Sequence, residues 1–177
     1  IFAIDFSFRY ADNSTYHFNA QPSNSSKQLI ANKDIVAFPC LTHDGINIDA
    51  FLIDHNSSQL LVIGQGYPGS KESLFYISRE FPDYDILIFD YRWHDTVNYY
   101  MTQSTILHPI KSLLNDCIQD VIAAVQTAQH RKKYISTTGL TLCYSGFTFL
   151  AAQNICHETL FDKIILDSCW LSLNEFC

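Results

Sequence analysis

Residues 139–150, Gly-Leu-Thr-Leu-Cys-Tyr-Ser-Gly-Phe-Thr-Phe-Leu, decide the fold of this chain. The run from Gly139 to Cys143 predicts a buried strand, and the apolar, alanine-rich run from Gly146 to Ile155 predicts a buried helix. The strand leads directly into Ser145 at the start of this helix. A sharp strand-to-helix turn can expose a side chain above a sheet, so Ser145 is the first candidate for a functional residue.

On both sides of this turn, short apolar runs alternate with longer helical stretches. Strand runs without polar alternation, separated by helices, indicate a parallel sheet covered on both faces. Two earlier runs flank His43-Asp44-Gly45, which predicts an antiparallel hairpin in front of the sheet, because glycine accepts the positive φ of a tight turn. The predicted strands are 35–41, 46–53, 60–63, 85–89, 139–143 and 163–166, and the predicted helices are 70–81, 109–131 and 146–155.

Length and composition restrict the class of protein. The 177 residues suffice for one domain, and we expect an N-terminal strand and polar loop over 1–28 and a domain over 29–177. The net charge of −7 argues against nucleic acid or an anionic membrane as the main partner. No apolar stretch approaches the roughly 20 residues of a membrane span. The six cysteines and seven histidines show no metal-ligand spacing, so we expect no metal.

A glycine-rich segment follows the predicted strand 60–63. Residues 64–69, Gly-Gln-Gly-Tyr-Pro-Gly, match the GxGxxG pattern of dinucleotide-binding turns through Gly64, Gly66 and Gly69. Asp90 follows at the end of the next strand, where a Rossmann-type fold places the acid that binds the ribose. Pro68 removes one backbone amide from this turn, and the antiparallel hairpin precedes it, which both disfavour that interpretation. A glycine-rich turn without any ligand is a further alternative.

The order of the motifs is more specific than any one of them. The hairpin, the glycine-rich turn, Asp90-Tyr91-Arg92, the turn at Ser145 and the strand that ends at Asp167 succeed one another along the chain. This succession resembles the α/β-hydrolase superfamily, most closely its acyl-hydrolase and serine-peptidase-like members. In the resemblance, Gln65-Gly66 stands for the family's His-Gly. The residues that flank the serine, Cys143 and Phe147, depart from the glycines of the G-x-S-x-G consensus.

The resemblance implies roles for several residues. Ser145 would be the nucleophile that attacks an ester or amide carbonyl, and the backbone amides of Tyr67 and Gly146 would form the oxyanion hole. In this family the acid and the histidine of the triad usually follow later strands, so the chain is expected to hold a partial hydrolase domain. Asp167 is the candidate acid and His94 the candidate base within these residues.

Three functions follow as hypotheses. The first is a serine hydrolase without cofactor that acts on a small ester or acyl substrate, with its activity or inactivity as this chain left open. The second is a non-catalytic binding protein of the same fold, and the third is the Rossmann-type dinucleotide-binding protein. We further expect the last strand to expose its edge and to favour self-association. The compartment stays open, and the cysteine pattern favours reduced thiols and thus the cytoplasm.

Overall fold

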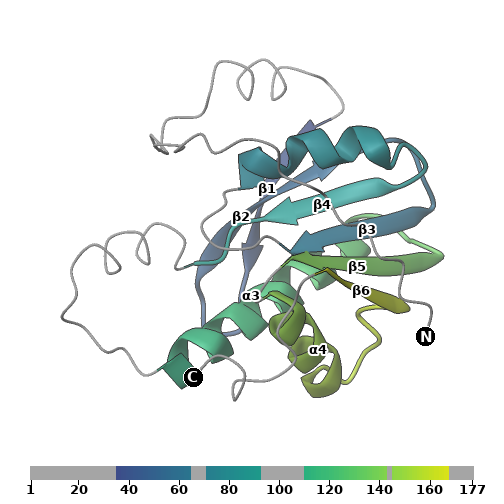
Figure 1. Ribbon diagram of the computed structural model, residues 1–177. Coiled ribbons are helices and arrows are strands. Elements are labelled where there is room, and N and C mark those ends of the chain that lie inside the picture. The colour runs from purple at the N-terminus through teal and green to yellow at the C-terminus, as the bar shows by residue number, and fades with distance from the viewer. Residues whose placement is uncertain (1–34, 65–70, 93–109, 143–144, 168–177) are drawn as a thin grey trace, which may run out of the picture.

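One mixed sheet of six strands, in the order β1-β2-β4-β3-β5-β6, organises the protein in the computed structural model. The structure describes residues 35–64, 71–92, 110–142 and 145–167. Figure 1 shows the sheet with its helices. The elements are β1 (Ile35–Leu41), β2 (Asn47–Ile53), β3 (Gln59–Gly64), the 3-10 helix η1 (Lys71–Glu80), β4 (Asp85–Phe89), α3 (Ile110–Arg131), β5 (Ser136–Leu142), α4 (Ser145–Ile155) and β6 (Lys163–Asp167).

The predicted hairpin is confirmed. Strands β1 and β2 pair antiparallel, with Ile35 opposite Ile53 and Leu41 opposite Asn47. Gly45 has a φ of 83°, the left-handed conformation for which glycine was expected in this turn. The Thr42 amide donates to the Ile46 carbonyl oxygen at 2.8 Å and closes the loop. Strand β2 then pairs antiparallel with β4, which attaches the hairpin to the rest of the sheet.

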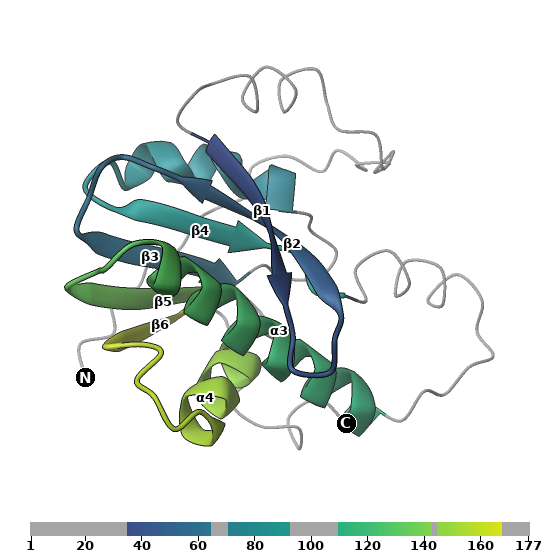
Figure 2. The same ribbon diagram turned by 180° about the vertical axis from the view of Figure 1, so that it is seen from behind.

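The other four strands form the predicted parallel sheet, in which β3 pairs with β4 and β5, and β5 pairs with β6. Side chains alternate between the two faces of each strand. Leu60 and Val62 pack in the cluster that contains α3 and α4, whereas Leu61 and Ile63 pack in the cluster that contains η1. Figures 1 and 2 show α3 and α4 on one face and η1 on the other. The predicted α/β class is therefore confirmed.

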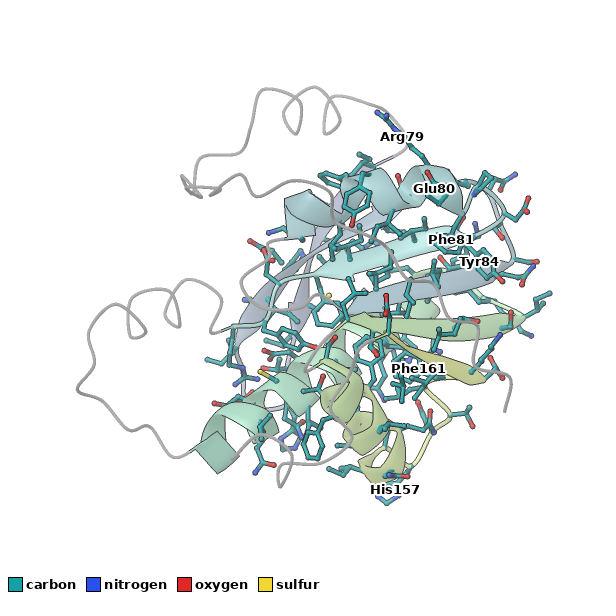
Figure 3. The ribbon with its side chains drawn as sticks, viewed as in Figure 1. Arg79, Glu80, Phe81, Tyr84, His157 and Phe161 are labelled. Atoms are coloured by element: carbon teal, nitrogen blue, oxygen red, sulfur yellow. The ribbon has the colours of Figure 1, made fainter. Side chains whose placement is uncertain are left out.

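Helix α4 packs closely against the sheet. The ring of its Phe149 stacks on Phe161 with a centroid distance of 4.9 Å, and Figure 3 shows Phe161 beside α4 and β6. A β-carbon added to Gly139 would lie 2.8 Å from the Phe149 ring, so glycine is required at this position of β5. The lack of a side chain at Gly139 lets the helix approach the strand.

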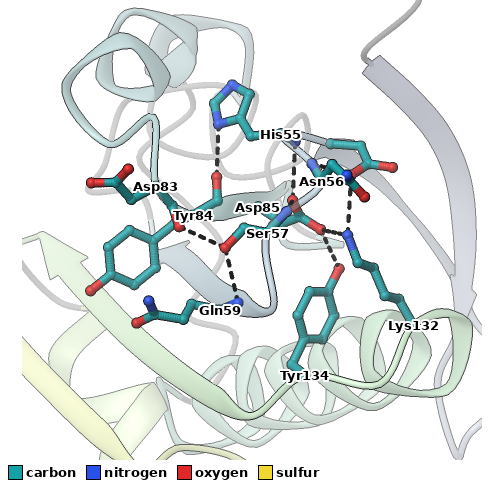
Figure 4. Close-up of polar contacts among 10 residues, drawn as sticks. His55, Asn56, Ser57, Gln59, Asp83, Tyr84, Asp85, Lys132 and Tyr134 are labelled. Carbon is teal, nitrogen blue, oxygen red and sulfur yellow. Dashed lines mark hydrogen bonds and ion pairs between the residues drawn. The ribbon is translucent and has the colours of Figure 1, made fainter.

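A buried carboxylate ties together the opposite, amino-terminal edge of the parallel strands. Asp85, at the start of β4, is fully buried and accepts hydrogen bonds from the backbone amides of His55 and Ser57. Its other oxygen accepts from the Lys132 ammonium at 2.6 Å and the Tyr134 hydroxyl at 3.1 Å (Figure 4). Burial alone would lower the pKa of Lys132, but its hydrogen bonds with Asp85 and Asp54 raise that pKa. This edge is thus a structural junction.

The predicted element boundaries differ from the structure mainly at β5. The prediction began this strand at Gly139, but it begins at Ser136 because alternate residues, among them Thr137, face the core. Polar β-branched residues fit a strand even where an apolar run is absent. No helix among the described residues has the length and apolarity needed to cross a membrane. The prediction for residues 1–28 falls outside the described part of the chain.

Candidate functional site at the carboxyl edge of the sheet

The carboxyl ends of β3, β4, β5 and β6 lie at the same edge because these strands are parallel. The connection after β3 leads to η1 on one face, and the connection after β5 leads to α4 on the other face. Open α/β sheets bind ligands where the connections of neighbouring strands diverge in this way. The ends of β3 and β5, at Gly64 and Leu142, therefore mark the candidate site.

Ser145 is the first residue of α4, and its side chain is fully buried. Its hydroxyl oxygen lies 2.6 Å from the carbonyl oxygen of Leu142 and 3.0 Å from that of Gly64, so its proton has two backbone acceptors. The same oxygen accepts a hydrogen bond from the Leu142 amide at 3.1 Å. In this structure the hydroxyl therefore joins the end of β5, the start of α4 and the end of β3. As nucleophile, Ser145 stays a prediction.

The start of α4 and the end of β3 touch each other. A β-carbon added to Gly64 would lie 2.9 Å from the Ser145 β-carbon and 2.8 Å from the Phe149 ring. Any larger residue at position 64 would push the helix start away from the strand, because real β-carbons do not approach other atoms so closely. Gly64, which the sequence singled out for a dinucleotide turn, thus serves helix packing.

The first turn of α4 can stabilise negative charge. The first amides of a helix have no partner within the helix, and the helix dipole adds positive potential there. Gly146 is the second residue of α4 and is buried, so its predicted oxyanion amide belongs to this first turn. The other predicted oxyanion residue, Tyr67, lies outside the described residues.

The candidate acid and base have different outcomes. Asp167 ends β6, and the strand register pairs it with Leu142, whose amide contacts the Ser145 hydroxyl. The candidate acid is therefore on the neighbouring strand at the same level of the sheet. His94 lies outside the described residues, so its role as base stays a prediction.

Asp90 follows β4 at the same edge, and its carboxylate binds Lys71. The Lys71 amide donates to one carboxylate oxygen at 2.8 Å and its ammonium to the other. In the dinucleotide hypothesis this carboxylate would bind a ribose, which would have to displace Lys71. Gly66 and Gly69, the other residues of that hypothesis, lie outside the described part of the chain.

The sequence did not reveal two polar contacts beside the site. The Tyr91 and Thr148 hydroxyls are 2.9 Å apart in the interior, and Arg92 binds Asp120, which is fully buried. Burial raises the pKa of the Asp120 carboxyl, whereas the hydrogen bonds from Arg92 lower it. One signal was available, because Asp120 is a charge that interrupts the apolar stripe through Cys117 and Val121 of α3.

The described ranges 35–64, 71–92, 110–142 and 145–167 contain no candidate metal site, because no group of three His, Cys, Asp or Glu side chains in them could hold an ion. Three cysteines in these ranges are free thiols. Burial raises the pKa of Cys40 to about 11 and that of Cys117 to about 12, and Cys156 is half-buried.

Solved structures share this arrangement of strands and helices. An esterase from Pyrococcus furiosus matches 76% of this chain and 50% of its own, with a TM-score of 0.56 and 17% identity. An esterase from Exiguobacterium antarcticum matches 76% of this chain and 46% of its own, with a TM-score of 0.54 and 20% identity. An α/β hydrolase from Penicillium sp. matches 75% and 45%, with a TM-score of 0.51 and 16% identity.

These similarities show that the chain has the α/β-hydrolase fold, as the resemblance implied. The chain spans about half the length of these structures. No protein-family model and no curated protein matches the sequence.

Proposed function

We propose, from the α/β-hydrolase fold of this chain, that the protein hydrolyses an ester or amide of a small acyl substrate at the junction of β5 and α4. The observation that carries the proposal is the contact between the start of α4 and the end of β3, where the Ser145 hydroxyl lies 3.0 Å from the Gly64 carbonyl. This contact brings the dipole of α4 to the sheet edge at which connections diverge. A negative charge that develops on a substrate carbonyl would be stabilised there.

Ser145 is the first candidate for the nucleophile. Its hydroxyl would attack the carbonyl carbon and pass its proton to a base, for which His94 stays the candidate, while the amide of Gly146 would stabilise the oxyanion, each such donor contributing about 3–4 kcal/mol to lowering the barrier. The bond from the acyl carbon to oxygen or nitrogen would then break, the protonated alcohol or amine would leave, and water would hydrolyse the acyl-enzyme. For attack, the hydroxyl has to leave the carbonyl oxygens of Leu142 and Gly64 and become exposed. The hypothesis therefore requires the start of α4 to rearrange when substrate binds.

The buried and occupied hydroxyl of Ser145 favours a second candidate for the nucleophile. Only residues 143 and 144 separate the last residue of β5 from the first residue of α4, and one of them is Cys143. A thiol next to a helix N-terminus has a lowered pKa and is a strong nucleophile as thiolate. In this version Ser145 would stabilise the turn. The Cys143 thiolate would attack the carbonyl carbon, the alcohol or amine would leave with a proton as its bond to the acyl carbon breaks, and water would hydrolyse the resulting thioester.

Probe labelling of the protein expressed from its complete reading frame distinguishes these candidates. A fluorophosphonate should modify Ser145 if it is the nucleophile, and iodoacetamide should rapidly modify Cys143 if the thiol is. The modified residue is identified by mass spectrometry, and turnover of p-nitrophenyl acetate is measured in parallel. Ser145→Ala and Cys143→Ala are the test variants. Cys156→Ala, which changes a half-buried thiol beyond the end of α4, is the matched control.

Each outcome has one meaning. Loss of turnover in Ser145→Ala alone, with fluorophosphonate labelling in the parent, supports the serine. Loss of turnover in Cys143→Ala, together with iodoacetamide labelling of Cys143 in both the parent and the Cys156→Ala control, supports the thiol as nucleophile. Absence of turnover and of labelling at both positions in the parent protein contradicts the proposed hydrolase and favours the non-catalytic alternative.

A further inference from the structure

The tripeptide Asp90-Tyr91-Arg92 leaves β4 at the carboxyl edge, and each of its side chains contacts a different element. Asp90 binds Lys71 of η1, Tyr91 contacts Thr148 of α4, and Arg92 binds Asp120 of α3. Three consecutive side chains therefore connect the end of one central strand to all the helices among the described residues.

The Asp90 carboxylate fixes the start of η1. Lys71 is the first residue of η1, and both its amide and its ammonium donate to Asp90. The Lys71 ammonium also lies 5.0 Å from the centre of the Phe51 ring, which fixes the side chain further. Asp90 thus holds the start of η1 at the end of β4.

Tyr91 fixes the first turn of α4. The Thr148 hydroxyl donates to the Ser145 carbonyl oxygen at 2.8 Å, so its single proton is already used. It follows that the Tyr91 hydroxyl donates to Thr148 across the 2.9 Å that separates them. Thr148 is fully buried, Tyr91 is 3% exposed, and the Tyr91 ring packs edge-on against Phe89. A buried hydrogen bond between two rigid elements holds their separation closely.

Arg92 anchors the tripeptide itself. Its amide and its guanidinium both donate to the Asp120 carboxylate, at 2.8 Å each, and its guanidinium also binds Asp44 in the hairpin turn. The Arg92 side chain is only 7% exposed. Hydrogen bonds to Asp44 and Asp120 raise the pKa of Arg92, although burial alone would lower it. The backbone of the tripeptide is therefore fixed to α3 on one side and to the hairpin on the other.

We propose that Tyr91 is a positioning residue of the proposed acyl-transfer site. Through Thr148, Tyr91 sets the place of the first turn of α4, which includes the Gly146 amide. The inference rests on the proposed function, because it assigns this contact to the helix turn whose amide would bind the substrate carbonyl. A misplacement of about 1 Å at such a site costs up to roughly a hundredfold in rate.

The test uses the protein expressed from its complete reading frame, with p-nitrophenyl acetate as substrate. Tyr91→Phe and Thr148→Val should each lower kcat about ten- to a hundredfold and leave KM within about twofold, because an interaction needed in the transition state is lost. Thr148→Ser keeps the hydroxyl and should keep kcat. Tyr134→Phe is the control, since it also removes one tyrosine hydrogen bond, but at the opposite edge.

Two kinetic results would overturn the proposal: a kcat within about twofold of the parent in Tyr91→Phe or in Thr148→Val, or an equal loss in Thr148→Ser and Thr148→Val. Amide hydrogen exchange gives a readout that does not need turnover. Exchange of residues 145–149 should become faster in Tyr91→Phe and Thr148→Val but not in Tyr134→Phe. A parent protein without turnover contradicts the proposed function. In that case, unchanged exchange of residues 145–149 in both variants overturns the positioning role of Tyr91. Faster exchange of these residues in both variants supports that role.

Discussion

The hydroxyl oxygen of Ser145 lies 3.0 Å from the carbonyl oxygen of Gly64, although 81 positions separate the two residues in the chain. This contact places the start of α4 directly beside the end of β3. The closeness depends on glycine, because a β-carbon at position 64 would collide with the Phe149 ring and with Ser145. The geometry of the candidate site is thus a consequence of packing in the core beneath it.

Gly64→Ala should therefore destabilise the protein and displace α4. We expect a loss of about 1–3 kcal/mol in the free energy of unfolding, the usual cost of excess volume in a packed core. The measurement is urea unfolding followed by circular dichroism. Phe149→Leu in the same chain makes room beside position 64 and should recover part of the loss. Two substitutions whose effects simply add would contradict this explanation.

Asp85→Asn should weaken the junction at the amino-terminal edge. The carboxylate is fully buried and has four hydrogen-bond donors, including the Lys132 ammonium. Removing one partner of a buried ion pair costs about 3–5 kcal/mol, and because Lys132 is partly exposed we expect the lower end of this range. The matched control is Asp83→Asn, an exposed neighbour on the same connection, which should change the stability by less than about 0.5 kcal/mol. Equal unfolding midpoints for both variants would show that the buried Asp85 carboxylate contributes no more to stability than the exposed Asp83 carboxylate.

Asp44 should contribute to stability in a pH-dependent way. The hydrogen bonds from Arg92 and from Thr42 lower the pKa of the Asp44 carboxyl from 3.8 to about 2 in the folded protein. A lowered folded-state pKa means that the contribution is present above about pH 4 and is lost as the pH falls towards 2. The parent should thus lose more stability than Asp44→Asn over this interval.

Unfolding in urea at several pH values between these limits measures that difference. The Asp44 side chain is 47% exposed, so we expect the difference to be small and to decrease further in about 1 M salt, where charges are screened over about 3 Å. A pH dependence that is identical in the parent and in Asp44→Asn would contradict the assignment.

The thiols should differ in reactivity in the folded protein. Burial raises the pKa of Cys40 to about 11 and that of Cys117 to about 12, so at pH 8 both are almost entirely protonated and shielded. Iodoacetamide at this pH should modify Cys156 much faster than either, because Cys156 is only half-buried. Peptide mass spectrometry follows each cysteine separately. Modification of Cys40 or Cys117 at the rate seen in urea would mean that the core opens readily.

Local signals predicted most of the fold. The bounds of β1 and β4 agree with the predicted runs, and Gly45 adopts the conformation expected of its turn. These features are readable because apolar periodicity and glycine conformation depend on neighbours in the chain. The start of β5 was missed because Ser136, Thr137 and Thr138 form a strand through pairing with β3 rather than through an apolar run.

The candidate site was less predictable than the fold. The sequence placed Ser145 and Asp167 at strand ends, and the strand register confirms that Asp167 lies level with the end of β5. It gave no indication that the Ser145 hydroxyl is buried against Gly64 and Leu142. It also gave no indication of the hydrogen bond between Tyr91 and Thr148. Neither tyrosine nor threonine indicates by its residue type which distant residue its hydroxyl will bind.

The sequence by itself determined the order of the elements, the hairpin and the turn into which β5 leads. Only the tertiary structure decided which groups around that turn are occupied: the Ser145 hydroxyl by two carbonyls, the Asp90 carboxylate by Lys71 and the Asp120 carboxylate by Arg92. The physical reason is the distance along the chain over which each feature is determined. Backbone conformation is selected over a few residues, whereas a buried polar group takes its partner from whichever strand or helix the packed core brings within hydrogen-bond distance.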